Sequence, residues 1–174
     1  MKTISKLRKT LNFHPQEINS SVKHFFENVI IDYKVWLPTK KMNLQRDFVW
    51  NIDQKRELIW SILMNRHIPR MSIMTMVKND HDIYQVIDGK QRLSAMIGFY
   101  KNEYTLLIDE KEYFFNELPI DYQRVIQGYH FAYYMAYEPF DAPFTDQDKI
   151  DWFTYINFAG TPQEREHFGR LTSK

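Results

Sequence analysis

The stretch Ile83–Tyr100 constrains the fold more than any other part of the chain. Residues 83–87 are mostly apolar and predict a buried strand, and Asp88-Gly89 is typical of a tight turn. After the turn, apolar side chains recur at helical spacing: Leu93, Met96, Ile97 and Tyr100. The pattern therefore predicts a strand, a glycine turn and a helix over about residues 90–100.

This turn is also the best candidate for a functional site. Gly89 permits a positive φ and a close approach of a ligand, and the first turn of a helix presents free N–H groups with partial positive charge. Lys90, Gln91 and Arg92 add further donors, so the turn could bind an anion, most commonly phosphate. Asp88 could hold a metal ion, orient a water or cap the helix. A plain turn with solvated Lys and Arg side chains explains the same residues, and both interpretations stay open.

Composition limits the class of protein. The chain has 174 residues, 44% of them hydrophobic, and a formal net charge of +1, which is typical of a globular domain and disfavours nonspecific DNA coating. There is no cysteine, which excludes disulfides and thiolate metal sites and favours the cytoplasm. No signal peptide is apparent, and no apolar run reaches the ~18 residues of a membrane span. The six histidines do not occur at metal-ligand spacing.

The first part of the chain predicts four elements. Residues 1–20 are polar and we expect an irregular arm. Ser20 or Ser21 is expected to cap a short helix, and residues 30–37 alternate weakly and predict one strand. An amphipathic helix should follow, with Asp53 as its N-cap.

The rest of the chain alternates hairpins and helices. The expected elements are a strand over 71–77 paired with 83–87, a hairpin over 104–108 and 112–115, a helix from Leu118-Pro119 to about 127, a strand over 129–137 and helices over 146–158 and 162–170. We find no repeat or low-complexity segment, and therefore predict one α+β domain spanning residues 1–174.

Three segments together resemble one protein family. They are Asn43-Leu44-Gln45-Arg46-Asp47-Phe48-Val49-Trp50, Val86-Ile87-Asp88-Gly89-Lys90-Gln91-Arg92-Leu93, and Phe153-Thr154-Tyr155-Ile156-Asn157-Phe158-Ala159-Gly160-Thr161-Pro162. In this order they resemble the ParB/sulfiredoxin-like domain at the N-terminal side of GmrSD-type modification-dependent restriction enzymes. The resemblance covers roughly residues 30–165. It implies a small mixed sheet with surrounding helices, nucleotide binding at the Asp88 turn and nucleoside triphosphate hydrolysis, coupled in those enzymes to cleavage of modified phage DNA.

The sequence departs from the family pattern at three places. Asn43 stands where the family usually has proline, and Pro162 is followed by Gln163-Glu164 rather than Leu-Ser. The His-Asn-His nuclease domain of the restriction enzymes has no counterpart in these residues. We therefore carry over no nuclease chemistry from that domain.

The resemblance assigns roles to individual residues. Asp88 and Arg92 are the candidate catalytic residues, and Asp88 is the candidate ligand of Mg²⁺. The candidate nucleotide or phosphate contacts are Gln45, Arg46, Gly89, Lys90, Gln91, Arg92 and Asn157. Arg46 suits phosphate because of its planar fork of donors, while an ion pair with Asp47 is the structural alternative. Asn157 sits at a helix end, where Asn is common for structural reasons.

Three functions stay open at this stage. The first is an Mg²⁺-dependent nucleoside triphosphatase in phage–host conflict. The second is a DNA-binding or nicking domain, and the third a non-catalytic nucleotide sensor or protein-interaction module. A separate effector or nuclease protein is the partner that the third function requires, and the many aromatic side chains leave homo-oligomerisation open.

Overall fold

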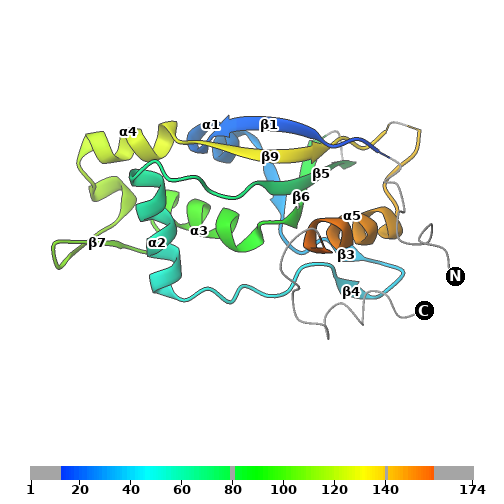
Figure 1. Cartoon of the computed structure of the whole chain (residues 1–174), viewed down its shortest axis with the longest axis horizontal. Coiled ribbons are helices and arrows are strands. Elements are labelled where there is room, and N and C mark those ends of the chain that lie inside the picture. Colours follow the sequence, from blue (N-terminus) through cyan, green and yellow to red (C-terminus); the bar gives the residue numbers. More distant parts are fainter. Residues whose placement is uncertain (1–12, 79–80, 140, 159–174) are drawn as a thin grey trace, which may run out of the picture.

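The computed structural model describes residues 13–78, 81–139 and 141–158, and confirms the α+β class. A mixed five-stranded sheet has the strand order β1-β9-β5-β6-β2 (Figure 1). Its strands are β1 (Gln16–Ser21), β2 (Ile30–Asp32), β5 (Met71–Lys78), β6 (His81–Asp88) and β9 (His130–Ala136). β1 pairs with β9, and β5 with β6, in antiparallel fashion, whereas β9 is parallel to β5 and β2 is parallel to β6.

Five helices and two short hairpins surround this sheet in the described part of the chain. The helices are α1 (Val22–Asn28), α2 (Ile52–Leu63), α3 (Lys90–Tyr100), α4 (Ile120–Gly128) and α5 (Asp146–Phe158), with a 3₁₀ turn η2 (Phe115–Glu117) before α4. The hairpins are β3 (Trp36–Leu37) with β4 (Met42–Asn43), and β7 (Leu106–Ile108) with β8 (Lys111–Tyr113). The predicted helix over residues 162–170 lies outside the described residues.

The centre of the sheet, formed by β5 and β6, is buried on both faces. Successive side chains of a strand point to opposite faces, so Ile73 and Val86 pack in a first core with residues of α1 to α4. Their neighbours Met74 and Ile87 pack in a second core with residues of β3 and α5. Figure 1 shows the corresponding division, with α5, β3 and β4 gathered at one end of the molecule and α2 and α4 at the other.

The central strand, turn and helix are confirmed. β6 ends at Asp88, Gly89 has a φ of 94°, and α3 begins at Lys90. β5 and β6 form the predicted hairpin, and α5 has the predicted bounds. Each of these elements has a regular apolar pattern that the two cores use directly.

The prediction of an irregular arm over residues 1–20 is wrong for residues 16–20, which belong to β1 (Gln16–Ser21). This strand is mostly polar, and its stability comes from backbone pairing with β9 along its whole length rather than from an apolar face. Ser21 does cap α1, since its Oγ accepts a hydrogen bond from the His24 N–H at 3.2 Å.

Two further boundaries differ from the prediction. The single strand over 30–37 is wrong, because Asp32 Oδ1 accepts the N–H groups of Lys34 and Val35 at 2.9 and 3.2 Å and turns the chain between β2 and β3. The N-cap of α2 is Asn51 rather than Asp53. Asn51 Oδ1 accepts the Gln54 N–H at 2.9 Å, and Gln54 Oε1 accepts the Asn51 N–H at 3.0 Å, forming a capping box.

Candidate functional site

Gly89 is required at the turn by both its backbone and its surroundings. A Cβ at this position would overlap Cγ of Met71 and lie 2.9 Å from Cβ of Met71, whose side chain is fully buried. The φ of 94° is also one that L-residues with side chains rarely adopt. Gly89 is the N-cap of α3, and among the described residues no side chain caps this helix. Of the alternatives for Asp88, the helix cap is therefore wrong.

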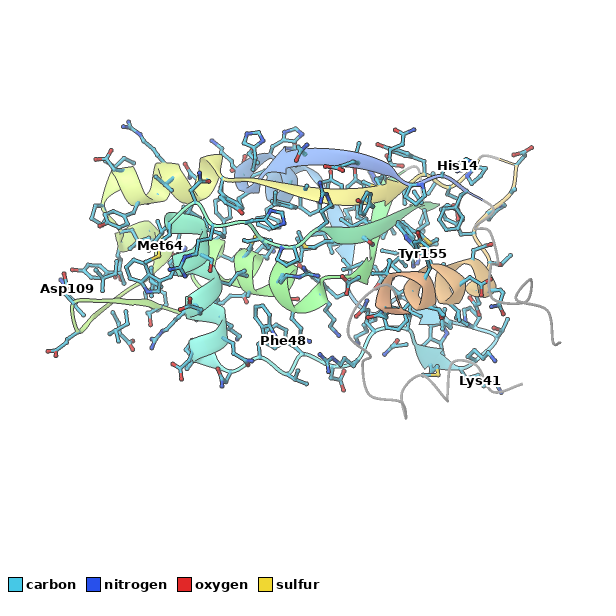
Figure 2. All side chains as sticks on the ribbon, in the orientation of Figure 1. His14, Lys41, Phe48, Met64, Asp109 and Tyr155 are labelled. Atoms are coloured by element: carbon cyan, nitrogen blue, oxygen red, sulfur yellow. The ribbon has the colours of Figure 1, made fainter. Side chains whose placement is uncertain are left out.

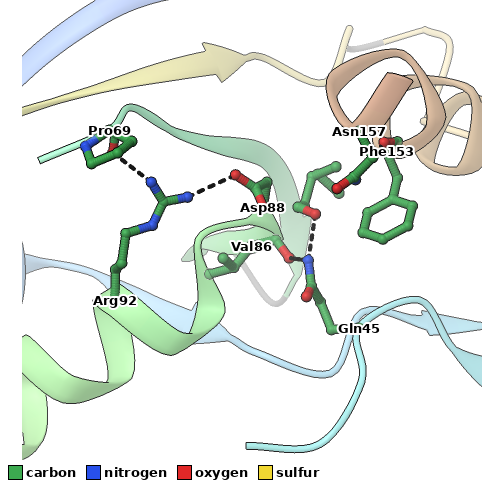
Figure 3. Close-up of polar contacts among 8 residues, drawn as sticks. Gln45, Pro69, Val86, Asp88, Arg92, Phe153 and Asn157 are labelled. Carbon is green, nitrogen blue, oxygen red and sulfur yellow. Dashed lines mark hydrogen bonds and ion pairs between the residues drawn. The ribbon is translucent and has the colours of Figure 1, made fainter. Parts of the chain in front are cut away.

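Asp88 instead forms an ion pair with Arg92 (Figure 3). Arg92 Nη2 lies 2.8 Å from Asp88 Oδ2, and Arg92 Nη1 donates to the Pro69 carbonyl oxygen at 2.8 Å. The side chain of Asp88 is 23% exposed and that of Arg92 is 17% exposed. Arg92 thus joins the end of β6, the first turn of α3 and the segment before β5. Its charge is balanced by Asp88, whose Oδ2 is the carboxylate oxygen in this pair.

Gln45 is bonded to the end of β6. Its Nε2 donates to the Val86 carbonyl oxygen at 3.1 Å and also to that of Ile87 (Figure 3). The preceding residue, Leu44, is buried in the second core, whereas Trp50 packs against the first. The segment Gln45–Val49 therefore passes the end of β6 on its way from one core to the other.

Lys90 and Gln91 fix this same segment to α3. Lys90 Nζ donates to the Arg46 carbonyl oxygen at 2.7 Å. Gln91 Oε1 accepts the N–H groups of Val49 and Trp50 at 3.0 and 3.2 Å, and Gln91 Nε2 donates to the Asp47 carbonyl oxygen at 3.1 Å. The first two motifs therefore form one structural unit, although they are about forty residues apart in the chain.

Phe48 anchors the middle of the segment (Figure 2). The ammonium of Lys55, on α2, lies 4.8 Å from the centroid of the Phe48 ring. This cation–π contact fixes the segment against α2 as well as α3.

Arg46 differs from the other motif residues because its side chain is exposed. In the ranges that the structure describes, its guanidinium has neither a hydrogen bond nor an ion pair, so the alternative of a pair with Asp47 is not observed. Its carbonyl oxygen, in contrast, is held by Lys90. The backbone of Arg46 is thus fixed beside the start of α3 while its side chain remains able to contact a ligand.

The ammonium of Lys90 lies in a partly buried, mixed-charge environment. Burial lowers the pKa of Lys90, and the charge of Lys34 lowers it further, while Asp47 and Asp32 oppose this shift. A second lysine thus lies close to the motif lysine. Lys34 could not be identified from the sequence, because the turn that carries it depends on the side chain of Asp32.

Asn157 comes from the other side of the sheet. Its Nδ2 donates to the Phe153 carbonyl oxygen one turn earlier in α5, at 2.7 Å. Figure 3 shows this part of α5 beside the end of β6 and Gln45. The structure therefore places residues 153–158 of the third motif near the other two motifs, and the amide nitrogen of Asn157 is used within its own helix.

Comparison with known families decides the relationship. The family model described as the GmrSD restriction endonuclease, N-terminal domain, matches residues 22–169. The chain belongs to this family. The GmrSD family is one of restriction endonucleases, so the chain is restriction-related. No match is found among curated proteins or among solved structures.

The described residues of this GmrSD N-terminal domain show neither a cluster of metal ligands nor a membrane-spanning helix. Among the described residues, no three His, Asp or Glu side chains are grouped so that they could hold a metal ion. Within the same ranges, no helix is long and apolar enough to span a lipid bilayer.

Proposed function

We propose that this domain binds a nucleoside triphosphate at the N-terminus of α3 and hydrolyses it with Mg²⁺ in a restriction-related reaction against phage DNA. We also propose that its fold is of the ParB/sulfiredoxin-like type. Membership of the GmrSD family and the arrangement of the motif residues support both proposals.

The observation that carries this proposal is the position of Arg46. The Lys90 ammonium holds the Arg46 carbonyl oxygen at 2.7 Å, and Lys90 is the first residue of a helix without a side-chain cap. The exposed guanidinium of Arg46 therefore extends from a backbone that is held by the first residue of α3, a helix whose first N–H groups have no acceptor within the helix. Both are donors suited to phosphate oxygens.

The residues divide into binding and reacting groups. Arg46, Lys90 and the first N–H groups of α3 would bind the phosphates. Asp88 would orient the attacking water, and Arg92 would fix the carboxylate through their 2.8 Å pair. Gln45, Gln91 and Asn157 would hold the surrounding segments in place. Attack of water on the terminal phosphorus breaks its bond to the bridging oxygen, releasing a nucleoside diphosphate and phosphate.

Magnesium fits this arrangement as an ion carried by the nucleotide. Mg²⁺ is commonly held by one or two carboxylates together with phosphate oxygens, and Asp88 is the carboxylate at the turn. When bound, it would neutralise charge on the phosphates.

Phosphate release from each of the four ribonucleoside triphosphates in the presence of Mg²⁺ tests the proposal. We expect turnover by the wild-type protein and its loss in Arg46→Ala, whose exposed side chain contributes little to stability. Arg124→Ala is the matched control, because the Arg124 side chain is 72% exposed on α4 and forms a long ion pair of 3.7 Å with Asp121. Equal turnover in both variants would contradict the proposal.

A nucleotide sensor is the second candidate. It is favoured by the ion pair between Asp88 and Arg92, because this pair already gives the Asp88 carboxylate a structural role at the turn. Binding by the wild-type protein, lost in Arg46→Ala but without phosphate release, would support the sensor. Such a sensor would act through a separate effector or nuclease protein.

DNA binding or nicking is the outcome that remains if nucleotides do not bind. It would require DNA affinity that falls steeply with salt, because phosphate neutralisation releases counterions. The net charge of +1 does not favour it.

A further inference from the structure

The turn after β2 lies at the same edge of the sheet as the start of α3. β2 and β6 are adjacent and parallel, with Asp32 paired opposite Gln85. The carboxyl ends of parallel neighbours meet at one edge, which is where open α/β sheets commonly bind ligands. Here one strand continues into the turn Asp32–Val35 and the other into Gly89 and α3.

This turn is held in a fixed conformation. Asp32 Oδ1 accepts the N–H groups of Lys34 and Val35, and Asp32 Oδ2 accepts Gln85 Nε2 at 3.0 Å. Val35 is fully buried and has a φ of 51°, which is unusual and costly for a β-branched residue. Its carbonyl oxygen accepts the Leu44 N–H at 3.0 Å, immediately before the Gln45–Val49 segment. The fold therefore maintains a strained turn next to the candidate site.

Lys34 is the exposed residue of this turn. In the part of the chain that the structure describes, its ammonium has no hydrogen bond or ion pair. It is close enough to Lys90 for its charge to act on that ammonium. The nearby acids are Asp47, which is exposed, and Asp32, whose oxygens already accept three hydrogen bonds.

A buried group at the base of the turn also lacks a partner. The Gln85 side chain is 4% exposed, and its Oε1 has no hydrogen-bond donor among the described residues. Buried polar atoms of this kind usually have a partner in the complete assembly, such as a water or a ligand group. Nε2 of the same carboxamide donates a hydrogen bond to Asp32, and Asp32 in turn accepts the Lys34 N–H. The oxygen without a partner therefore lies beside the residue that fixes the turn carrying Lys34.

We infer that Lys34 is a third phosphate-binding cation of this site, which binds a polyphosphate jointly with Arg46 and Lys90. The three residues come from three segments that hydrogen bonds join: the Val35 carbonyl oxygen to Leu44, and Lys90 to the Arg46 carbonyl oxygen. An anion between them would relieve the repulsion between the lysines. The inference rests on the proposed nucleotide site and specifies its ligand as one with at least two linked phosphates.

Calorimetric titration with inorganic tripolyphosphate, and separately with ATP and AMP, tests the inference at low salt. We expect Lys34→Ala to weaken tripolyphosphate and ATP binding about tenfold or more, as for the loss of one charged hydrogen bond. Lys34→Arg should retain most of the affinity. Lys23→Ala, at an exposed position on α1, is the matched control and should bind as the wild type does. A thermal midpoint unchanged in Lys34→Ala shows that the turn is intact.

The outcomes separate this inference from the proposed function. Tripolyphosphate binding that depends on Lys34, without nucleotide binding, supports the role of Lys34 and contradicts the nucleotide site. Nucleotide binding that is equal in Lys34→Ala and Lys23→Ala overturns the role of Lys34 and leaves the nucleotide site standing. Absence of binding by the wild-type protein to all three probes overturns both.

Discussion

Replacing Gly89 by alanine tests how much the close packing of the turn against Met71 contributes to the stability of the fold at the candidate site. The added Cβ would overlap Met71 Cγ and lie 2.9 Å and 3.1 Å from Met71 Cβ and Sδ. A φ of 94° in a residue with a side chain costs about 1–3 kcal/mol, and overpacking a buried site costs about 1–3 kcal/mol. We therefore expect Gly89→Ala to lower the free energy of unfolding by about 2–6 kcal/mol, measured by urea denaturation followed by circular dichroism.

Gly128→Ala is the matched control. No atom lies within 4 Å of a Cβ placed on Gly128, at the end of α4, and its φ is not in the strained positive range. Alanine there should be neutral, or stabilising by up to about 1 kcal/mol through the unfolded chain. Combining Gly89→Ala with Met71→Ala should cost less than the sum of the single changes, because the second removes the atoms that the first overlaps. Equal unfolding free energies for Gly89→Ala and Gly128→Ala would refute the reasoning.

Three other changes test particular contacts. Gln91→Leu removes the hydrogen bonds to the backbone of Asp47, Val49 and Trp50, and we expect the free energy of unfolding to fall by about 1–3 kcal/mol, with faster amide hydrogen exchange in that segment. Unchanged exchange would contradict the role of Gln91 in holding the segment. Asn51→Ala should lower the free energy of unfolding by about 1 kcal/mol through the loss of the N-cap of α2, whereas Asp53→Ala should lower it by less, both measured by thermal unfolding. The reverse order would favour Asp53 as the N-cap. Burial raises the pKa of Tyr100 to about 12, so the unfolded chain loses this proton at lower pH than the folded protein, and stability should fall between pH 10 and about 12. Tyr100→Phe should reduce that fall, and an alkaline unfolding curve identical to that of the wild type would contradict this prediction.

The sequence sufficed for elements whose apolar pattern is used directly by the core. β6, α3 and α5 have such patterns, and their predicted positions agree with the structure. β1 has no such pattern because an edge strand is stabilised by pairing with its neighbour, and the neighbour of β1 is β9, more than a hundred residues later. The break between β2 and β3 depends on one side chain, Asp32, that alternation of hydrophobicity does not register.

The sequence predicted which residues make up the candidate site, but not which hydrogen bonds they form within the protein. The residue types at positions 88–92 indicated an anion site, and the structure brings Gln45, Arg46 and Asn157 toward that turn. The spacing could not indicate which of these side chains form hydrogen bonds within the protein and which are left to contact a ligand. Gln91 and Gln45 bind backbone atoms about forty residues away, and such contacts exist only once the segment Gln45–Val49 has been placed by the two cores.

The central claim is that a nucleotide binds at the start of α3 beside Arg46. The most direct measurement is a two-dimensional ¹⁵N–¹H NMR titration of the protein with ATP and Mg²⁺, observing the Lys90 and Gln91 amides and the Arg46 Nε–H. The account predicts that these signals shift most and saturate together. Saturating shifts confined to other residues, or no shifts at millimolar ATP, would contradict it.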